Sequence, residues 1–448
     1  MLTFAGLIVA GTLVLRLPVC HGDATVGWLD ALFTATSAVC VTGLITIDTE
    51  SGFSRTGQAV ILVLIQLGGL GLMTFGAFAV QLLQRHVSFG SQAALQDTFF
   101  QSGARGDLKS ALRKILVLTF LIETAGALLL RAGLAGSGPS GAGWFEAVFL
   151  SVSAFCNAGF SVYDDSVMRL RDSQLIMWTL MVLIVAGGLG YMVLLEVWER
   201  VRRGGRRRLD GAVRWSLNTR VVLFMSVLLV GGGAMAFLFS GLAHPDTSLP
   251  DLALHALFQS VTARTAGFNS VDMSLVAVPT LMIMIFLMFI GGSPGSCAGG
   301  VKTTSVAIWA ARVTARLTGR EHVNVGGRRV PHDVVRRASL VVAMAGLWNA
   351  AGIMILANTE NVGSRHQAAD GENPGRELRF EHVIFEQVSA FATVGLSAGI
   401  TSELSTPGRL WILVSMFVGR LGPLTVALAV MKRPRSPFAY PQERVMIG

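Results

Sequence analysis

The chain has 448 residues, of which 52% are hydrophobic and only 14% are charged, and its formal net charge is +9. Its mean hydropathy of +0.59 excludes an ordinary soluble protein, and apolar stretches long enough to cross a bilayer recur along the whole sequence. The positive charge would also suit a nucleic-acid-binding protein, but no basic soluble domain carries it, so we expect no nucleic-acid partner.

The apolar stretches come in four pairs and predict eight membrane spans. They cover residues 2–19, 58–84, 113–133, 174–200, 216–242, 276–318, 334–358 and 407–431. The stretch 276–318 is predicted to be a long helix broken in its middle. Between the members of each pair lies a segment too short to cross, predicted to be a half-helix that enters from outside and stops near mid-membrane. These segments cover 27–38, 143–155, 250–262 and 379–391.

The predicted fold class is therefore an all-α polytopic membrane protein with four tandem units, each a span, a pore helix and a second span, in pseudo-fourfold arrangement around a central pore. The predicted boundaries are unit 1 at 1–85, a cytoplasmic linker at 86–112, unit 2 at 113–203, a basic linker at 204–215, unit 3 at 216–318, a linker at 319–333, unit 4 at 334–431 and a short cytoplasmic tail at 432–448.

A short motif that contains one strictly placed glycine follows each predicted pore helix. Its copies read Thr36-Ser-Ala-Val-Cys-Val-Thr-Gly43-Leu, Val152-Ser-Ala-Phe-Cys-Asn-Ala-Gly159-Phe, Val261-Thr-Ala-Arg-Thr-Ala-Gly267-Phe and Val388-Ser-Ala-Phe-Ala-Thr-Val-Gly395-Leu. The third copy is one residue shorter before its glycine. An aromatic residue precedes the glycine at a matching place, at Phe33, Phe149, Phe258 and Phe385. Five residues after the glycine stand Asp48, Asp164 and Asp272, but Ile400 in the fourth copy.

These four motifs predict a selectivity filter. Non-helical backbone at membrane depth must be buried in protein or line water. Glycine's freedom at positive φ would let carbonyl oxygens face the axis and replace the water shell of an ion. The alternative is that the glycines only let helices pack closely, which four matching copies make the weaker explanation. The candidate ion-binding residues are Val41, Thr42, Gly43, Asn157, Ala158, Gly159, Thr265, Ala266, Gly267, Thr393, Val394 and Gly395.

The stretch 291–304 inside the sixth apolar region is the second candidate site, because its proline and five glycines cannot continue a helix. The corresponding places in the other units carry shorter glycine-containing sequences, so unit 3 alone has an insertion. We expect the stretch to line the cavity below the filter; a water-exposed turn between two short spans is the alternative. Its candidate residues are Gly291, Gly292, Ser293, Pro294, Gly295, Ser296, Gly299, Gly300 and Lys302.

Two arginines fall at membrane depth. Arg420 is expected to face the cavity below the filter as a positive barrier to cations, since an unpaired arginine mid-membrane is costly; pairing with a carboxylate such as Glu123 is the alternative. Arg264, in the third motif, is expected to support the filter from behind. The motif aspartates, with Asp30 and Glu146 in the first two pore helices, are expected to make the outer vestibule negative, although helix capping would explain each one singly.

Charge distribution predicts the orientation. Most of the 36 Lys and Arg residues fall in loops after the second span of each unit, in runs such as 200–214 and 312–337. The positive-inside rule places these loops and the N-terminus in the cytoplasm. The basic stretches 86–112, 201–215 and 319–333 could dock a regulatory partner, and the excess of positive charge could also contact anionic lipid heads.

The four motifs, the repeated span–pore–span units and the broken helix of unit 3 resemble the Trk/Ktr/HKT superfamily of potassium transporters, most closely the membrane subunit of bacterial Ktr and Trk systems. The resemblance covers essentially the whole chain. It implies potassium as the transported ion, with Gly43 as the glycine that accompanies potassium preference. It also implies that the stretch 291–304 with Arg420 is an intramembrane gate. A homodimer, a separate ring of cytosolic nucleotide-binding (RCK-type) subunits and the bacterial inner membrane follow from the same resemblance.

The predicted function is a K⁺-translocating pore subunit that conducts ions down their electrochemical gradient, with Na⁺ a possible second ion. Ion-coupled secondary transport with Na⁺ or H⁺ is the alternative, but broken helices in that class usually occur in inverted repeats, and these units run in the same sense. An enzyme is not expected, because the sequence offers no nucleophile–base pair or metal-ligand spacing at membrane depth. No cofactor is predicted. Unequal filter copies predict only moderate selectivity.

Overall fold

The computed structural model describes residues 2–22, 25–83, 108–137, 143–203, 215–240, 249–273, 276–360 and 379–422. The predicted linkers 86–112 and 204–215 lie almost entirely outside these ranges, and the tail 432–448 lies entirely outside them. The predicted linker 319–333 is described and contains a small antiparallel hairpin of strands β1 (Asn324–Val325) and β2 (Arg328–Arg329).

Each predicted unit contains the expected order of helices. Unit 1 has α1 (Leu2–Leu15), η1 (Pro18–Cys20), the pore helix α2 (Trp28–Cys40), α3 (Thr49–Gly52) and α4 (Arg55–Leu83). Unit 2 has α6 (Leu108–Ser137), the pore helix α7 (Trp144–Cys156), η2 (Met168–Leu170), α8 (Gln174–Leu189) and α9 (Tyr191–Arg203). Unit 3 has α10 (Leu217–Phe239), the pore helix α11 (Leu249–Thr262), α12 (Val278–Phe289) and α13 (Thr303–Leu317). Unit 4 has α14 (His332–Thr359), the pore helix α15 (Phe380–Ala392), η5 (Thr401–Glu403) and α16 (Thr406–Leu421).

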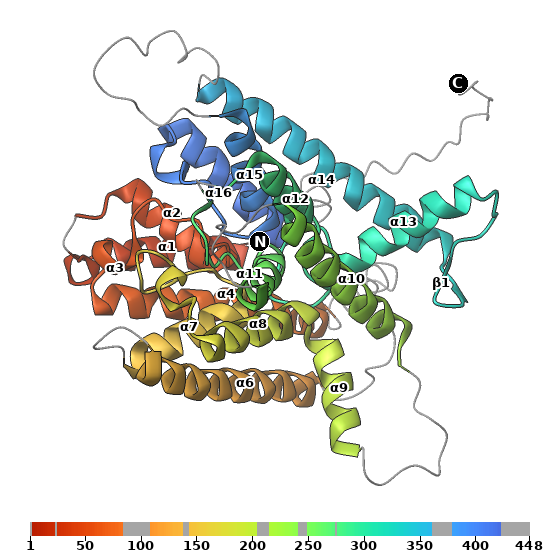
Figure 1. Cartoon of the computed structure of the whole chain (residues 1–448), viewed down its shortest axis with the longest axis horizontal. Helices are drawn as coiled ribbons and strands as arrows, with labels where there is room; N and C mark the ends of the chain where they lie inside the picture. The colour runs from red at the N-terminus through yellow and green to blue at the C-terminus, as the bar shows by residue number, and fades with distance from the viewer. Residues whose placement is uncertain are drawn as a thin grey trace.

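The units follow one another around a central axis in chain order, as the progression of colour in Figure 1 shows. At every boundary the second span of one unit packs against the pore helix of the next: α4 on α7, α8 on α11, α12 on α15, and α16 back on α2. The last of these contacts closes the circle. The same packing rule at four boundaries is what a pseudo-fourfold arrangement requires, so the predicted tandem architecture is confirmed.

Ion pairs join two of these boundaries near the starts of the pore helices. Arg55 at the start of α4 reaches Glu146 in the first turn of α7, with 2.5 Å between nitrogen and oxygen. Arg409 near the start of α16 reaches Asp30 in the first turn of α2 at 3.3 Å. Each carboxylate thus has an arginine partner at a boundary between units, and the expectation that Asp30 and Glu146 make the outer vestibule negative stays a prediction.

The pore helices are buried because they lie between the spans rather than against lipid. The four matching phenylalanines are fully buried at Phe33, Phe149, Phe258 and Phe385. The first residues of two pore helices, Trp28 and Trp144, are exposed at the outer surface of the bundle, where tryptophan commonly lies at a membrane interface. The spans instead expose apolar side chains such as Val63, Phe224 and Leu347, so the exterior of the bundle is suited to a lipid solvent.

Some of the described spans end earlier than predicted, as α1 does at Leu15, whereas α6 and α14 are longer than predicted. Three helices are long and apolar enough to cross a membrane, at Arg113–Gly136, Leu217–Phe239 and His332–Thr359. The pair Gln174–Leu189 and Tyr191–Val201 is bent by 109° at Gly190 and would make a fourth. The prediction of one continuous span over 174–200 is wrong, because Gly190 at φ +85° ends α8 as glycine commonly ends helices.

A break below the filter is therefore common to several units. Gly190 in unit 2 and Gly422 in unit 4 both have φ +85° and both terminate the second span. Residues after Gly422 lie outside the described ranges, so the predicted extension of the last span to 431 cannot be followed there. Unit 3 has a longer interruption between α12 and α13. The insertion in unit 3 thus enlarges a break for which unit 2 already has a smaller form.

Candidate ion filter and gate

The four glycine motifs adopt the same backbone conformation. Each pore helix is followed by a non-glycine residue at positive φ, and the glycine lies two positions later, also at positive φ. The non-glycine residues are Val41 (φ 55°), Asn157 (φ 59°), Thr265 (φ 80°) and Thr393 (φ 51°). The glycines are Gly43 (φ 98°), Gly159 (φ 69°), Gly267 (φ 78°) and Gly395 (φ 92°). A β-branched residue at positive φ is a true outlier, and three of the four loops contain one, which marks the loops as a functional site.

A hydroxyl residue in the last turn of each pore helix holds the loop. In units 1, 2 and 4 a serine carbonyl accepts the amide hydrogen of the residue before the glycine, as in Thr42 to Ser37 at 2.8 Å. The hydroxyl of the same serine binds the loop a second time: Ser389 donates to the carbonyl of Leu396 at 2.6 Å. Thr262 takes this part in unit 3 and donates to the carbonyl of Phe268 at 2.8 Å. The one-residue deletion of the third motif therefore leaves the loop held in the same way.

The four loops meet in a closed ring. A methyl group placed on each glycine would collide with the carbonyl oxygen that precedes the glycine of the next loop. The distances are 2.5 Å from Gly43 to Ala158, 2.9 Å from Gly159 to Ala266, 2.3 Å from Gly267 to Val394 and 2.0 Å from Gly395 to Thr42. The last contact joins unit 4 to unit 1. The structure thus brings all twelve predicted filter residues together around one axis, with four carbonyl oxygens packed against four neighbouring glycines.

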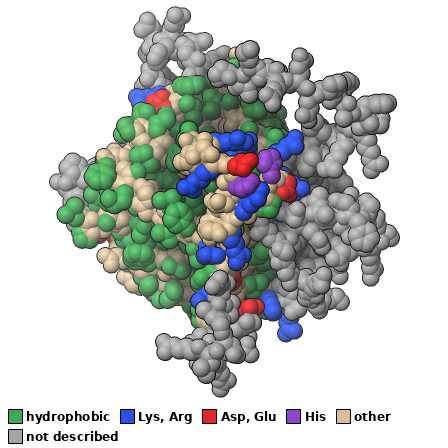
Figure 2. All heavy atoms as spheres, turned by 90° about the vertical axis from the view of Figure 1, so that its right-hand side faces the viewer, with side chains coloured by type: hydrophobic (Ala, Val, Ile, Leu, Met, Phe, Trp, Pro, Cys, Tyr) green, Lys and Arg blue, Asp and Glu red, His purple; other side chains and the backbone are tan. Residues whose placement is uncertain are grey.

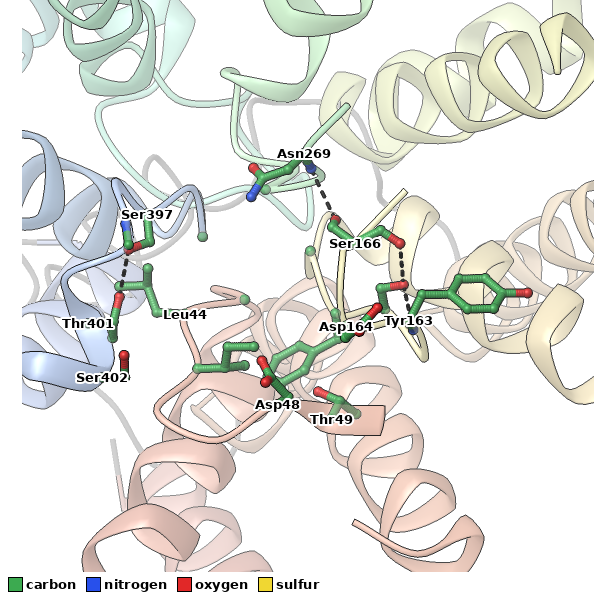
Figure 3. Close-up of a pocket in the computed structure, with 18 of the residues that line it drawn as sticks. Leu44, Asp48, Thr49, Tyr163, Asp164, Ser166, Asn269, Ser397, Thr401 and Ser402 are labelled. Atoms are coloured by element: carbon green, nitrogen blue, oxygen red, sulfur yellow. Dashed lines mark hydrogen bonds between the residues drawn. The ribbon is translucent and has the colours of Figure 1, made fainter. Parts of the chain in front are cut away.

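A hollow of about 540 Å³ opens on one side of this ring and is lined by residues of all four units. Figure 3 looks into it: Asp48 and Thr49 come from unit 1, Asp164 and Ser166 from unit 2, Asn269 from unit 3, and Ser397 and Thr401 from unit 4. The four ring glycines and the three motif aspartates are all part of its lining. The hollow therefore has the position and the charge expected of an outer vestibule.

The vestibule aspartates differ in their surroundings. Burial, together with the neighbouring carboxylates of Asp164 and Glu50, raises the pKa of Asp48 above its ordinary value. Asp164 has a cationic partner in Arg169, which also contacts Asp165 at 2.8 Å and Glu50 at 3.8 Å. Burial and the two neighbouring carboxylates therefore both act against the charged form of Asp48.

The stretch 291–304 lies against the opposite side of the ring and is almost entirely buried. A methyl group on Gly299 would lie 2.2 Å from the hydroxyl of Thr393. Ser293 and Cys297 donate their amide hydrogens to the carbonyls of Gly188 at 3.0 Å and Gly187 at 3.3 Å. The alternative of a water-exposed turn is wrong, because within this stretch only Gly295 is exposed. The loop is packed between the filter and the broken end of the second span of unit 2.

Arg420 connects this loop to two other units. Its guanidinium donates to the carbonyl of Gly68 in α4 at 2.8 Å and to the carbonyl of Cys297 in the loop. The side chain is 2% exposed. The alternative that Arg420 pairs with Glu123 is wrong: Glu123 accepts a hydrogen bond from Gln66 at 3.0 Å instead, and no ion pair between Glu123 and Arg420 occurs in the described residues. Arg420 thus binds main-chain oxygens, one of them on the loop itself.

Two further cations lie close to the filter. Lys302 donates to the carbonyl of Ala298 at 2.6 Å and so closes the end of the loop on itself. Arg264 is buried, and its Nε atom has no hydrogen-bond partner among the described residues. Its expected supporting role behind the filter stays a prediction.

Sequence reasoning missed two features of the site. Glu386 is fully buried in pore helix α15 behind the fourth filter loop, and Gln259 occupies the matching place in α11. A carboxyl group in the middle of a pore helix was a visible signal. The thiols of Cys156 and Cys297 also lie together: a methyl group on Gly69 would be 2.7 Å from one sulfur and 3.6 Å from the other. Nothing in the sequence indicated that contact, because it depends on where the loop folds back.

Comparisons with known proteins agree with this geometry. A family profile, TrkH, described as a cation transport protein, matches residues 5–439. The Ktr system potassium uptake protein B of Vibrio alginolyticus is 33% identical over 100% of this chain and 94% of its own length. The potassium/sodium uptake protein NtpJ of Enterococcus hirae is 32% identical over 99% of this chain and 95% of its own length. The crystal structure of the potassium transporter TrkH from Vibrio parahaemolyticus superposes with a TM-score of 0.73 at 19% identity, over 96% of this chain and 83% of that one.

Proposed function

Because the chain belongs to the TrkH family of cation transport proteins, we propose that it is the K⁺-translocating pore subunit of a potassium uptake system. Full-length relatives at 32–33% identity are named for potassium uptake. The family consists of transport proteins, so catalysis is not part of the proposal. The TrkH crystal structure supports the fold. The apolar exterior of the bundle supports a multi-pass membrane protein.

The observation that carries the proposal is the closed ring of four loops. The glycine of each loop lies against a carbonyl oxygen of the next loop, with the chain's fourth loop closing on its first. Carbonyl oxygens arranged around an axis can replace the hydration shell of a monovalent cation. The four pore helices end at this ring, and the C-terminal end of a helix carries a partial negative charge. Ring and helix ends together favour a cation at the centre.

The ring is not fourfold symmetric, and this supports only moderate selectivity. The position two residues before the glycine carries three different residue types, at Val41, Asn157, Thr265 and Thr393. The Nδ2 atom of Asn157 lies 3.3 Å from the Thr265 hydroxyl, whereas the Thr393 hydroxyl has no partner among the described residues. Na⁺ is accordingly a second ion to test, in keeping with the name of the Enterococcus relative.

The gate of this pore is the loop 291–302 with Arg420. The loop lies directly against the filter at Thr393, so an ion leaving the filter on that side meets it. Arg420 adds a positive charge at the same depth and holds the loop by the Cys297 carbonyl. Opening would require the loop to leave its hydrogen bonds with Gly187, Gly188 and Arg420. The strain-free turns at its glycines make such a movement inexpensive for the backbone.

A regulatory partner would dock on the basic face. Figure 2 shows Lys and Arg side chains gathered around histidine side chains on the side of the molecule that carries α13 and β1. Exposed arginines of α13, the hairpin and the start of α14 supply them, at Arg316, Arg320, Arg328, Arg329, Arg336 and Arg337. We assign this face to the cytoplasm, since positive residues mark cytoplasmic loops. A cytosolic nucleotide-binding (RCK-type) ring and a second copy of this chain complete the proposed assembly in a bacterial inner membrane.

The test is transport by the full chain. Expression in a bacterium stripped of its own potassium uptake systems should restore growth at micromolar potassium, and Gly395→Ser should abolish the rescue. Uptake of ⁸⁶Rb⁺ by purified protein in liposomes should follow the membrane potential, whose inward force is about 2.3 kcal/mol per charge per 100 mV. Uptake with a fixed Na⁺ or H⁺ stoichiometry would show ion-coupled transport instead. Failure of both rescue and flux would overturn the proposal.

A further inference from the structure

Glu386 is a buried carboxyl group behind the fourth filter loop. It lies in the middle of α15, is fully buried, and forms no ion pair among the described residues. Its hydrogen-bond partners all belong to the segment that follows Gly395. Ser397 donates to one carboxyl oxygen at 3.0 Å, Thr401 lies against the other, and the amide of Ala398 also donates to the group. The carboxyl therefore ties the vestibule end of the loop to the pore helix.

Glu386, Ser397 and Thr401 form a closed ring of three contacts, because the Thr401 hydroxyl also lies 2.9 Å from the Ser397 hydroxyl. Figure 3 shows this last contact as a dashed line at the edge of the vestibule. Three oxygen–oxygen contacts need three hydrogens, and each hydroxyl supplies one. The third hydrogen has to come from the carboxyl group. An ionised Glu386 would leave one contact without a hydrogen and would bury a charge without a counter-charge, which is strongly unfavourable.

Unit 3 contains a neutral version of the same arrangement. Gln259 stands at the matching place of its pore helix, eight residues before Gly267 in the shorter third motif, while Glu386 stands nine residues before Gly395. The side chain of Gln259 is also fully buried. Its Nε2 atom donates to the hydroxyl of Ser270 at 3.0 Å, just beyond the glycine. In unit 3, pore helix α11 thus supplies the uncharged amide of Gln259, which can both donate and accept hydrogen bonds.

We propose that Glu386 is a neutral positioning residue of the filter, which through Ser397 and Thr401 fixes the shape of the fourth quarter of the ring and so contributes to the discrimination between K⁺ and Na⁺. The segment it holds includes Gly399 and leads directly from Gly395 into the vestibule lining. The unit 4 glycine has the least room of the four: a methyl group on Gly395 would lie 2.0 Å from the Thr42 oxygen, nearer than at the other three filter glycines. A loop in that position has the least freedom to shift without moving a carbonyl of unit 1.

Substitution of Glu386 separates hydrogen bonding from charge. E386Q keeps a donor and an acceptor in the same place and should keep the K⁺ to Na⁺ uptake ratio within about twofold of the wild type. E386A leaves the two hydroxyls unsatisfied and should lower the ratio about tenfold, the effect of one lost buried partner. S397A, at a half-buried position, should lower the ratio in the same direction and serves if E386A does not fold. Equal loss in E386Q and E386A would overturn the proposal in favour of a charged Glu386.

Glu360 provides a matched control. It is also buried, and it accepts hydrogen bonds from Ser405 at 2.6 Å and 3.2 Å at the ends of α14 and α16, but it is not part of the vestibule lining. E360A should leave the ion ratio unchanged even if it lowers the melting temperature. An unchanged ratio in E386A and S397A, or an equal change in E360A, would remove the positioning role.

Because this inference rests on the proposed K⁺ pore, a second readout does not use transport. The infrared spectrum of the full-length wild-type protein should contain the carbonyl band of a protonated carboxylic acid that is absent from E386Q. A spectrum unchanged by E386Q would overturn the neutral assignment whether or not the protein conducts. Absence of flux in the wild type with the band present would count against the proposed function alone.

Discussion

The four filter glycines should not tolerate alanine equally, although the sequence makes them equivalent. Gly395 and Gly159 are the extremes. An added methyl group would lie 2.0 Å from the Thr42 oxygen at Gly395 but 2.9 Å from the Ala266 oxygen at Gly159. To reach ordinary contact the neighbouring carbonyl would have to move by about 1.4 Å in the first case and about 0.5 Å in the second. Gly267 and Gly43 are intermediate, at 2.3 Å and 2.5 Å.

Backbone strain acts in the same direction for these two extremes, although Gly43 has the largest φ of the four, at +98°. Gly159 has φ +69°, close to the left-handed region that other residues can adopt, whereas Gly395 has φ +92°. Left-handed conformation alone costs about 1–2 kcal/mol per residue, which is about a tenfold effect on an equilibrium. We therefore expect Gly159→Ala to reduce ⁸⁶Rb⁺ uptake by about tenfold at most and Gly395→Ala to reduce it to background, with Gly267→Ala below Gly43→Ala.

The assay is uptake into liposomes that contain equal amounts of each purified variant, normalised to wild type. Gly231→Ala is the control, because a methyl group there meets nothing within 4 Å and alanine is the better helix former. Its uptake should equal that of the wild type. Equal losses in all four filter variants, or a larger loss at Gly159 than at Gly395, would refute the reasoning from ring contacts.

Three further predictions concern the gate and the vestibule. Arg420→Gln should increase K⁺ flux in the absence of any regulatory partner, because it weakens the contact with Cys297 and removes a positive charge below the filter; unchanged or lower flux in stable protein would contradict this. Cd²⁺ bound between the thiols of Cys156 and Cys297 should hold the loop and block uptake until a chelator is added, and Cys297→Ser should be insensitive. The raised pKa of Asp48 means that it loses its charge at a higher pH than an ordinary aspartate as external pH falls. Uptake at low potassium should fall with it, and D48N should lack that step while having lower uptake at neutral pH.

Features that repeat four times could be predicted from the sequence. The pore helices begin and end within two residues of the predicted segments, as α7 (Trp144–Cys156) shows for 143–155. The glycine positions predicted the ring, because a backbone that adopts positive φ against a neighbouring carbonyl requires glycine at that position in every copy. Repetition also made the order of helices in each unit predictable, since every copy supports the others.

Features that depend on contacts between units could not be predicted. The sequence offered Glu123 as a partner for Arg420, but the folded chain brings the carbonyls of Gly68 and Cys297 within reach instead. The bend at Gly190 was hidden for a similar reason, because the apolar composition continues through it into α9. Hydropathy measures how apolar a segment is, but it does not show where the helix axis bends.

Covalent linkage of four unequal units would allow the proposed gate to be built from one unit alone. The loop of unit 3 lies against Thr393 of unit 4, binds the carbonyls of Gly187 and Gly188 in unit 2, and shares Arg420 with Gly68 of unit 1. One loop therefore already contacts all three other units below the ring. Four identical subunits would each bring such a loop to the same space, where they would collide. A single chain can lengthen the break in one unit and keep it short elsewhere, and the same freedom lets each quarter of the filter carry its own side chains. The unequal ring and the proposed gate would thus have one physical cause.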